Sequence, residues 1–166
     1  MTSPGRAGGS RRVPRWLWSC PAGTPTAGIV QRLGFATEPV SELSARSWTD
    51  EDAVMAGLAA DFPMPDYFGR NWDAVDECVA DLCANGRLIV VRGIHPAAQE
   101  WVARFADCVG SMWARGAAPA GHVAVVLAGW PTPDLTARWP ASPPGHHRVL
   151  PLSATPPSAA PGEPQG

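Results

Sequence analysis

The chain has 166 residues, 45% of them hydrophobic, which suffices for one domain with a filled core and terminal extensions. The formal net charge of −2 conceals an uneven distribution, because residues 48–82 hold nine acidic residues against Arg70 alone, a net charge of −8. Such a surface repels the phosphates of nucleic acids. It therefore excludes direct nucleic-acid binding and favours a cationic protein surface as partner.

The cysteines and the hydropathy indicate a reduced, cytoplasmic protein. Cys20, Cys78, Cys83 and Cys108 form no CxxC pair and no zinc-like spacing. No stretch approaches 18 uninterrupted apolar residues, and the N-terminus lacks the apolar region of an export signal. We expect no membrane segment, no metal and no cofactor.

The two ends of the chain differ in composition from the middle. Residues 1–12 are typical of a flexible basic arm, and residues 131–166, with ten prolines, are typical of a disordered tail. His146 and His147 fall in that tail without further metal ligands beside them. The domain itself is predicted to span residues 13–130.

The first elements of the domain are a strand and a helix. Residues 15–20 carry tryptophans at alternate positions and predict a strand, whereas residues 33–48 are ambiguous and allow a second edge strand. A helix is predicted from Thr49, which opens a weakened capping box, to about Ala60, with Gly57 as a weak point.

An acidic helix follows the proline-rich connection at residues 61–69. Asn71 is a favourable N-cap, and a face of apolar residues with helical spacing follows it. That face consists of Val75, Cys78, Val79 and Leu82.

The charges of this helix are unfavourable for its stability. Asp73, Glu77 and Asp81 lie four residues apart in one row, with Asp76 beside them, and each like-charge pair costs roughly 0.2–0.5 kcal/mol. Asp81 also lies near the C-terminus of the helix, where the backbone dipole disfavours an anion. No basic residue compensates at four-residue spacing, so the row points to a role in binding rather than to a plain solvated face.

The remaining elements alternate between strand and helix. Residues 87–91 and 122–128 are continuous apolar runs typical of buried parallel strands, and residues 97–115 have the periodicity of a helix. The pattern predicts a small α/β domain with a parallel sheet.

Catalytic motifs are absent from the sequence. There is no GxSxG, no phosphate-binding glycine loop and no HExxH, and His95 and His122 are isolated. The carboxylates lie along one helix rather than across a cleft, so we do not expect an enzyme.

The segment Pro65–Leu82, PxYFGxNWDAxxECxxDL, resembles the signature of the barstar family of ribonuclease inhibitors. The similarity extends over roughly residues 40–128, and the order of the following strand, helix and strand is the same. The resemblance implies a three-stranded parallel sheet packed against helices, to which residues 15–20 would add an N-terminal strand.

The resemblance also implies a function for the acidic row. Members of this family cover the cationic active site of a secreted-type ribonuclease with this helix and the loop before it, so that carboxylates occupy the place of RNA phosphate. The partner-binding positions expected from it are Tyr67, Asn71, Asp73, Ala74, Asp76, Glu77 and Asp81.

Departures from the family pattern leave the partner open. Glu77 replaces an aspartate, Asp76 a tryptophan and Asp81 a glycine, and an acid expected on the last helix matches either Ser111 or Asp107. The alternatives are a monomeric inhibitor of the immunity type that blocks a ribonuclease, and an interaction module for another basic protein.

Overall fold

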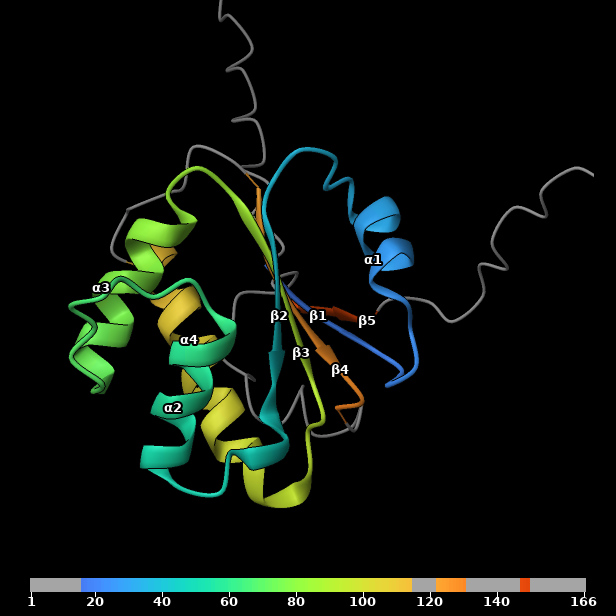
Figure 1. Cartoon of the computed structure of the whole chain (residues 1–166). Coiled ribbons are helices and arrows are strands. Elements are labelled where there is room, and N and C mark those ends of the chain that lie inside the picture. The colour runs from blue at the N-terminus through green and yellow to red at the C-terminus, as the bar shows by residue number, and fades with distance from the viewer. Residues whose placement is uncertain (1–15, 115–121, 131–146, 150–166) are drawn as a thin grey trace, which may run out of the picture.

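The computed structural model describes residues 16–114, 122–130 and 147–149, and its strands form one parallel sheet (Figure 1). Each pair of neighbouring strands within the described residues is parallel. In spatial order the five strands are β2 (Val40–Ser44), β3 (Arg87–Arg92), β4 (Val123–Ala128), β1 (Leu17–Cys20) and β5 (His147–Val149).

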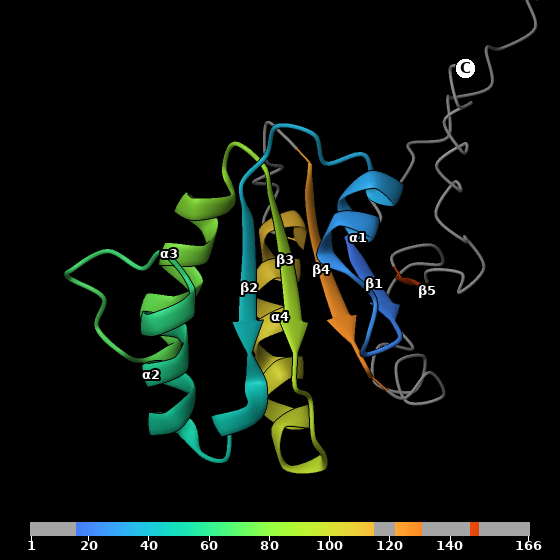
Figure 2. The same ribbon diagram turned by 45° about the vertical axis from the view of Figure 1, so that its right-hand side comes forward.

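Three helices cover one face of the sheet (Figure 2): α2 (Glu51–Asp61), α3 (Trp72–Cys83) and α4 (Gln99–Ala114). Ile89 and Val91 of β3 point into the core beneath these helices, whereas the alternate residues of the strand face the opposite side. Burial on both faces explains why β3 reads as a continuous apolar run.

The opposite face of the sheet is covered by α1 (Thr26–Leu33). Ile29 of this helix is fully buried and belongs to a second core cluster with Phe35, Leu88 and Val90. The helix ends at Gly34, whose φ of 75° lies in the left-handed region that glycine adopts at little cost.

The fold class predicted from the sequence is confirmed. Strands β2, β3 and β4 form the expected parallel core of the sheet, and β1 is the additional N-terminal strand. Two elements were not anticipated: α1, and β5 within the segment 131–166 that was expected to be disordered. Apart from β5, that segment lies outside the described residues, as does the predicted basic arm at residues 1–12.

Two predicted helix starts need correction. Helix α2 is capped by Asp50 rather than by Thr49, because the Oδ1 atom of Asp50 accepts the backbone N–H of Ala53 at 2.9 Å. Helix α4 begins at Gln99 rather than at residue 97, because Pro96–Ala98 form the short 3₁₀ turn η2.

The N-terminal unit of β1 and α1 is linked to the rest of the domain by the close packing of Trp16, just before β1, against Gly110 of α4. A Cβ atom at Gly110 of α4 would lie 2.6 Å from the Cζ2 atom of Trp16, which precedes β1 and is 4% exposed. Glycine in the middle of a helix is unfavourable by roughly 0.5–1 kcal/mol relative to alanine. Here its lack of a side chain lets the indole of Trp16 approach the helix.

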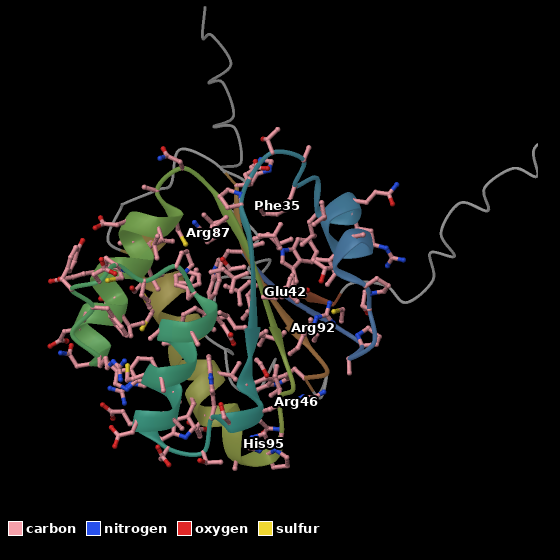
Figure 3. The ribbon with its side chains drawn as sticks, in the orientation of Figure 1. Phe35, Glu42, Arg46, Arg87, Arg92 and His95 are labelled. Carbon is pink, nitrogen blue, oxygen red and sulfur yellow. The ribbon has the colours of Figure 1, made fainter. Side chains whose placement is uncertain are left out.

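Arg92, at the end of β3, makes the polar connection to the same unit. Its guanidinium donates to the carbonyl oxygens of Ala22 at 3.1 Å and Thr24 at 2.8 Å, and to Thr26 Oγ1 at 2.9 Å. It also forms an ion pair with Glu42 of β2 at 3.4 Å (Figure 3). One side chain therefore ties the loop before α1 to two strands of the sheet.

Gly57 is another close-packing position, and it yields a stability prediction. A Cβ atom there would lie 2.5 Å from Nε1 of the fully buried Trp48. Gly57→Ala gains about 1 kcal/mol of helix propensity but forces Trp48 to shift, at a cost of typically 1–3 kcal/mol. We expect a net loss of about 1 kcal/mol in the free energy of unfolding, measured by urea denaturation.

The control for this prediction is Gly28→Ala in α1. Nothing lies within 4 Å of a Cβ atom at Gly28, so the same exchange should raise the free energy of unfolding by about 0.5–1 kcal/mol. Equal stabilisation by both changes would show that Trp48 adjusts without cost.

Candidate functional site on helix α3

The N-terminus of α3 is fixed by its capping residue, as the sequence predicts. The side chain of Asn71 accepts the backbone N–H of Ala74 at 2.8 Å and donates to the carbonyl oxygen of Gly69 at 3.2 Å. Arg70, just before the cap, has a φ of 48° in the left-handed region. The loop therefore enters the helix in a defined conformation.

The apolar side of α3 turns the acidic row toward solvent. Val75, Cys78 and Val79 are buried as predicted, and Leu82 is half-buried. Asp73, Glu77 and Asp81 are all exposed, and none of them forms an ion pair with a described residue. The three carboxylates thus remain available to a partner.

Asp76 differs from the other acids of the helix. It is half-buried, and its Oδ1 atom accepts a hydrogen bond from Ser111 Oγ of α4 at 3.0 Å. Ser111 also donates to the carbonyl oxygen of Cys108 at 2.8 Å. Of the two positions proposed for the acid on the last helix, Ser111 contacts α3, and Asp107 is exposed one turn earlier.

The loop before α3 presents the aromatic member of the predicted set. Tyr67 is 81% exposed, whereas its neighbour Phe68 packs on the core beneath the helices. Ala74 is half-buried on the first turn of α3. Tyr67 is a favourable contact position, because it is exposed in a loop that the neighbouring Phe68 anchors to the core, and because a tyrosine ring loses little conformational entropy on binding.

Arg87 offsets the unfavourable C-terminal charge of α3. Its Nε–H donates to the carbonyl oxygen of Leu82 at 3.2 Å, and another guanidinium nitrogen donates to Ser41 Oγ at 2.8 Å. The guanidinium carbon lies 5.5 Å from the ring centroid of Phe62. A cation bonded to the last turn counters the repulsion that Asp81 experiences from the helix dipole.

The row of acids also affects a buried thiol. The pKa of Cys78 is raised, first by burial and then by the negative charges of Asp81 and Glu77. A raised pKa keeps the thiol protonated at neutral pH, where it is a poor nucleophile and a poor metal ligand. Cys78 therefore packs as a small apolar side chain of the helix.

The sequence did not reveal a cluster of three residues at the start of α3, formed by Trp72 of this helix with Trp101 and Arg104 of α4. The indole rings of Trp72 and Trp101 stack with centroids 6.4 Å apart and an interplanar angle of 1°. The guanidinium carbon of Arg104 lies 4.4 Å from the centroid of the Trp72 ring. The helical spacing of Trp101 predicts only its packing; the contact with α3 depends on how the two helices pack.

Neither a metal site nor a membrane span is found in the part of the chain that the structure describes. Within it, no three His, Cys, Asp or Glu side chains gather in a way suited to a metal ion. No helix of that part is long and apolar enough to cross a bilayer. The features that the structure does show at α3 are the exposed carboxylates of Asp73, Glu77 and Asp81 and, beside them, the stacked rings of Trp72 and Trp101.

Taken together, the fold and the site define a small parallel α/β domain with a row of exposed carboxylates on α3. The sequence model of the Barstar family, described as Barstar (barnase inhibitor), matches residues 38–128, more than half of the chain. The chain belongs to the barstar family. A search of curated proteins finds no match. Strand β1, helix α1 and strand β5 lie outside the matched residues.

Proposed function

We propose that this protein is a cytoplasmic, monomeric inhibitor of the immunity type, which blocks the active site of a ribonuclease with α3. The family description names a barnase inhibitor, and the exposed row of Asp73, Glu77 and Asp81 is the observation that carries the proposal. The active site of a ribonuclease is cationic because it binds RNA phosphate. Carboxylates on a rigid helix are therefore complementary to it.

The contact set proposed for this function joins the loop to the helix. Tyr67 and Asn71 belong to the loop and the cap, Asp73 and Ala74 to the first turn, and Glu77 to the centre of the row. Asp81 lies toward the rim. Asp76, held by Ser111, supports the shape of the surface as well as its charge.

A second candidate function is an interaction module for a basic protein that is not a ribonuclease. The observation in its favour is Asp76, which stands where the best-known member of the family has a tryptophan and which is hydrogen-bonded to α4. An aromatic contact with a ribonuclease is thereby replaced by a carboxylate. The proposal that the protein itself is not an enzyme holds for both candidates.

The test is inhibition of RNA cleavage by a panel of barnase-type ribonucleases. We expect stoichiometric inhibition of at least one enzyme and no cleavage by the protein alone. The variant Asp73→Asn should lose inhibition of that enzyme, whereas Asp52→Asn, an equal change of charge at an exposed residue of α2, should retain it. If no ribonuclease is inhibited and a basic protein of another kind is captured, the second candidate function replaces the first.

A further inference from the structure

The N-terminal end of α3 carries a feature of opposite charge to the acidic row. The Trp101 ring stacks on the Trp72 ring, and the Arg104 guanidinium lies over the Trp72 ring at 4.4 Å. Trp72 is 9% exposed, Trp101 is half-buried and Arg104 is exposed. The two aromatic rings are therefore a packed platform, and the cation on it is open to solvent.

The contact with the Trp72 ring leaves the N–H groups of Arg104 without a hydrogen bond to any residue that the structure describes. A guanidinium that lies on an aromatic ring keeps its N–H groups directed outward, where they match the geometry of a carboxylate. Arg104 forms no ion pair with any residue that the structure describes. Arg70, also exposed, directly precedes the cap of the same helix end and is likewise unpaired among the described residues.

The α3 surface therefore carries charges of both signs. Two exposed arginines, Arg70 and Arg104, lie at its first turn together with Asp73, and the acidic row continues along the helix through Glu77 and Asp81. The contact between Asp76 and Ser111, one turn beyond Trp72, shows that α4 stays beside α3 over this distance. A partner with cationic groups alone would match the row but would leave Arg70 and Arg104 without a partner.

We propose that Arg104, stacked on Trp72 and assisted by Arg70, binds a carboxylate of the same protein partner whose cationic groups meet the acidic row. This inference rests on the proposed function, because the partner is the one that α3 binds. Arg and Trp are the residue types enriched among the energetically dominant contacts of protein interfaces. The aromatic pair restricts the guanidinium before binding, so that less conformational entropy is lost in the complex. The carboxylate fixes the direction in which the partner lies along α3.

The first test needs no ribonuclease and uses acetate as the probe. Sodium acetate is titrated into the full-length protein, at ionic strength held constant with sodium chloride, while the Nε–H signal of Arg104 and the indole N–H signal of Trp72 are followed by NMR. We expect a saturable shift of both signals in the millimolar range. Arg104→Gln should abolish the Trp72 shift, and Arg46→Gln, at an exposed arginine after β2 (Figure 3), should leave it intact.

The second test uses a ribonuclease that the panel identifies. It asks whether Arg104→Glu strengthens or weakens the binding of that ribonuclease. Arg104→Glu makes the surface more negative, so attraction of a cationic partner by net charge alone predicts tighter binding. The proposed carboxylate contact predicts at least tenfold weaker binding, with Arg46→Glu within twofold of the unchanged protein. Tighter binding by Arg104→Glu, or acetate shifts that persist in Arg104→Gln, would overturn the inference. Because the acetate titration is independent of any enzyme, failure of the proposed function leaves that test intact.

Discussion

A chain that begins at Glu38 is expected to lose its cooperative thermal transition, although it contains the whole segment matched by the family. The deletion removes β1 and α1, and with them the buried side chains of Leu17, Ile29 and Phe35. Each large apolar side chain contributes about 1.5–3 kcal/mol when buried. The summed loss is comparable with the total stability of about 5–15 kcal/mol for a typical domain.

The deletion also uncovers the far face of the sheet. Leu88 and Val90 of β3 and Val126 of β4 are fully buried in the cluster with α1 and would become exposed to solvent. Circular dichroism melts would detect the loss of the transition. A chain that begins at Pro14 is the control and should melt like the full chain, since it lacks only the predicted arm and Val13. A cooperative melt of the shorter chain within a few degrees of the control would contradict the prediction.

Glu77→Gln is expected to change stability and binding in opposite directions. In the free protein it removes repulsion from both Asp73 and Asp81, so the free energy of unfolding should rise by a few tenths of a kcal/mol. In the complex with the proposed ribonuclease partner it leaves positive groups of the partner unpaired, at a cost of about 2 kcal/mol or more. That cost corresponds to at least a roughly 30-fold increase in Kd.

Asp81→Asn is the matched comparison for this prediction. It relieves the helix in the same direction, and because we propose that Asp81 lies at the rim of the contact surface, the change should mainly slow association. Association should also slow steeply with added salt, because the Debye length of about 8–10 Å near physiological ionic strength limits attraction by the acidic segment. Thermal melts and binding kinetics at two ionic strengths measure both quantities. If Glu77→Gln destabilises the free protein and leaves binding unchanged, the row is structural.

Helix α3 was predictable from the sequence because its determinants are local. The cap at Asn71 and the apolar spacing from Val75 to Leu82 act within one helix, and the exposure of the acidic row follows from them. Strands β3 and β4 were equally predictable from the sequence. A short run of consecutive apolar residues is typical of a strand that is buried on both faces of a parallel sheet.

The elements that were missed depend on distant parts of the chain. Helix α1 has only eight residues, no side-chain cap at Pro25 and no acidic residue in its first turn, so its start lacks the usual local signals, and Ile29 is buried only against the far face of the sheet. The three residues of β5 carry no signal apart from their pairing with β1. The direction of Asp76 toward Ser111, and the position of Arg104 over Trp72, follow from how α4 packs beside α3.

The position of β1 in the sheet has a consequence for the order of events during synthesis. Leu17 pairs with Val125, which is made 108 residues later. At a translation rate of about 5–20 residues per second, the first strand waits roughly 5–20 s for its neighbour. Throughout that interval Leu17 and Trp18 of β1, and Trp16 just before it, remain without β4, one of the two strands that flank β1, and pairing at such a sequence distance is intrinsically slow. The nascent chain is therefore expected to offer a tryptophan-rich segment to chaperones before the domain closes around it.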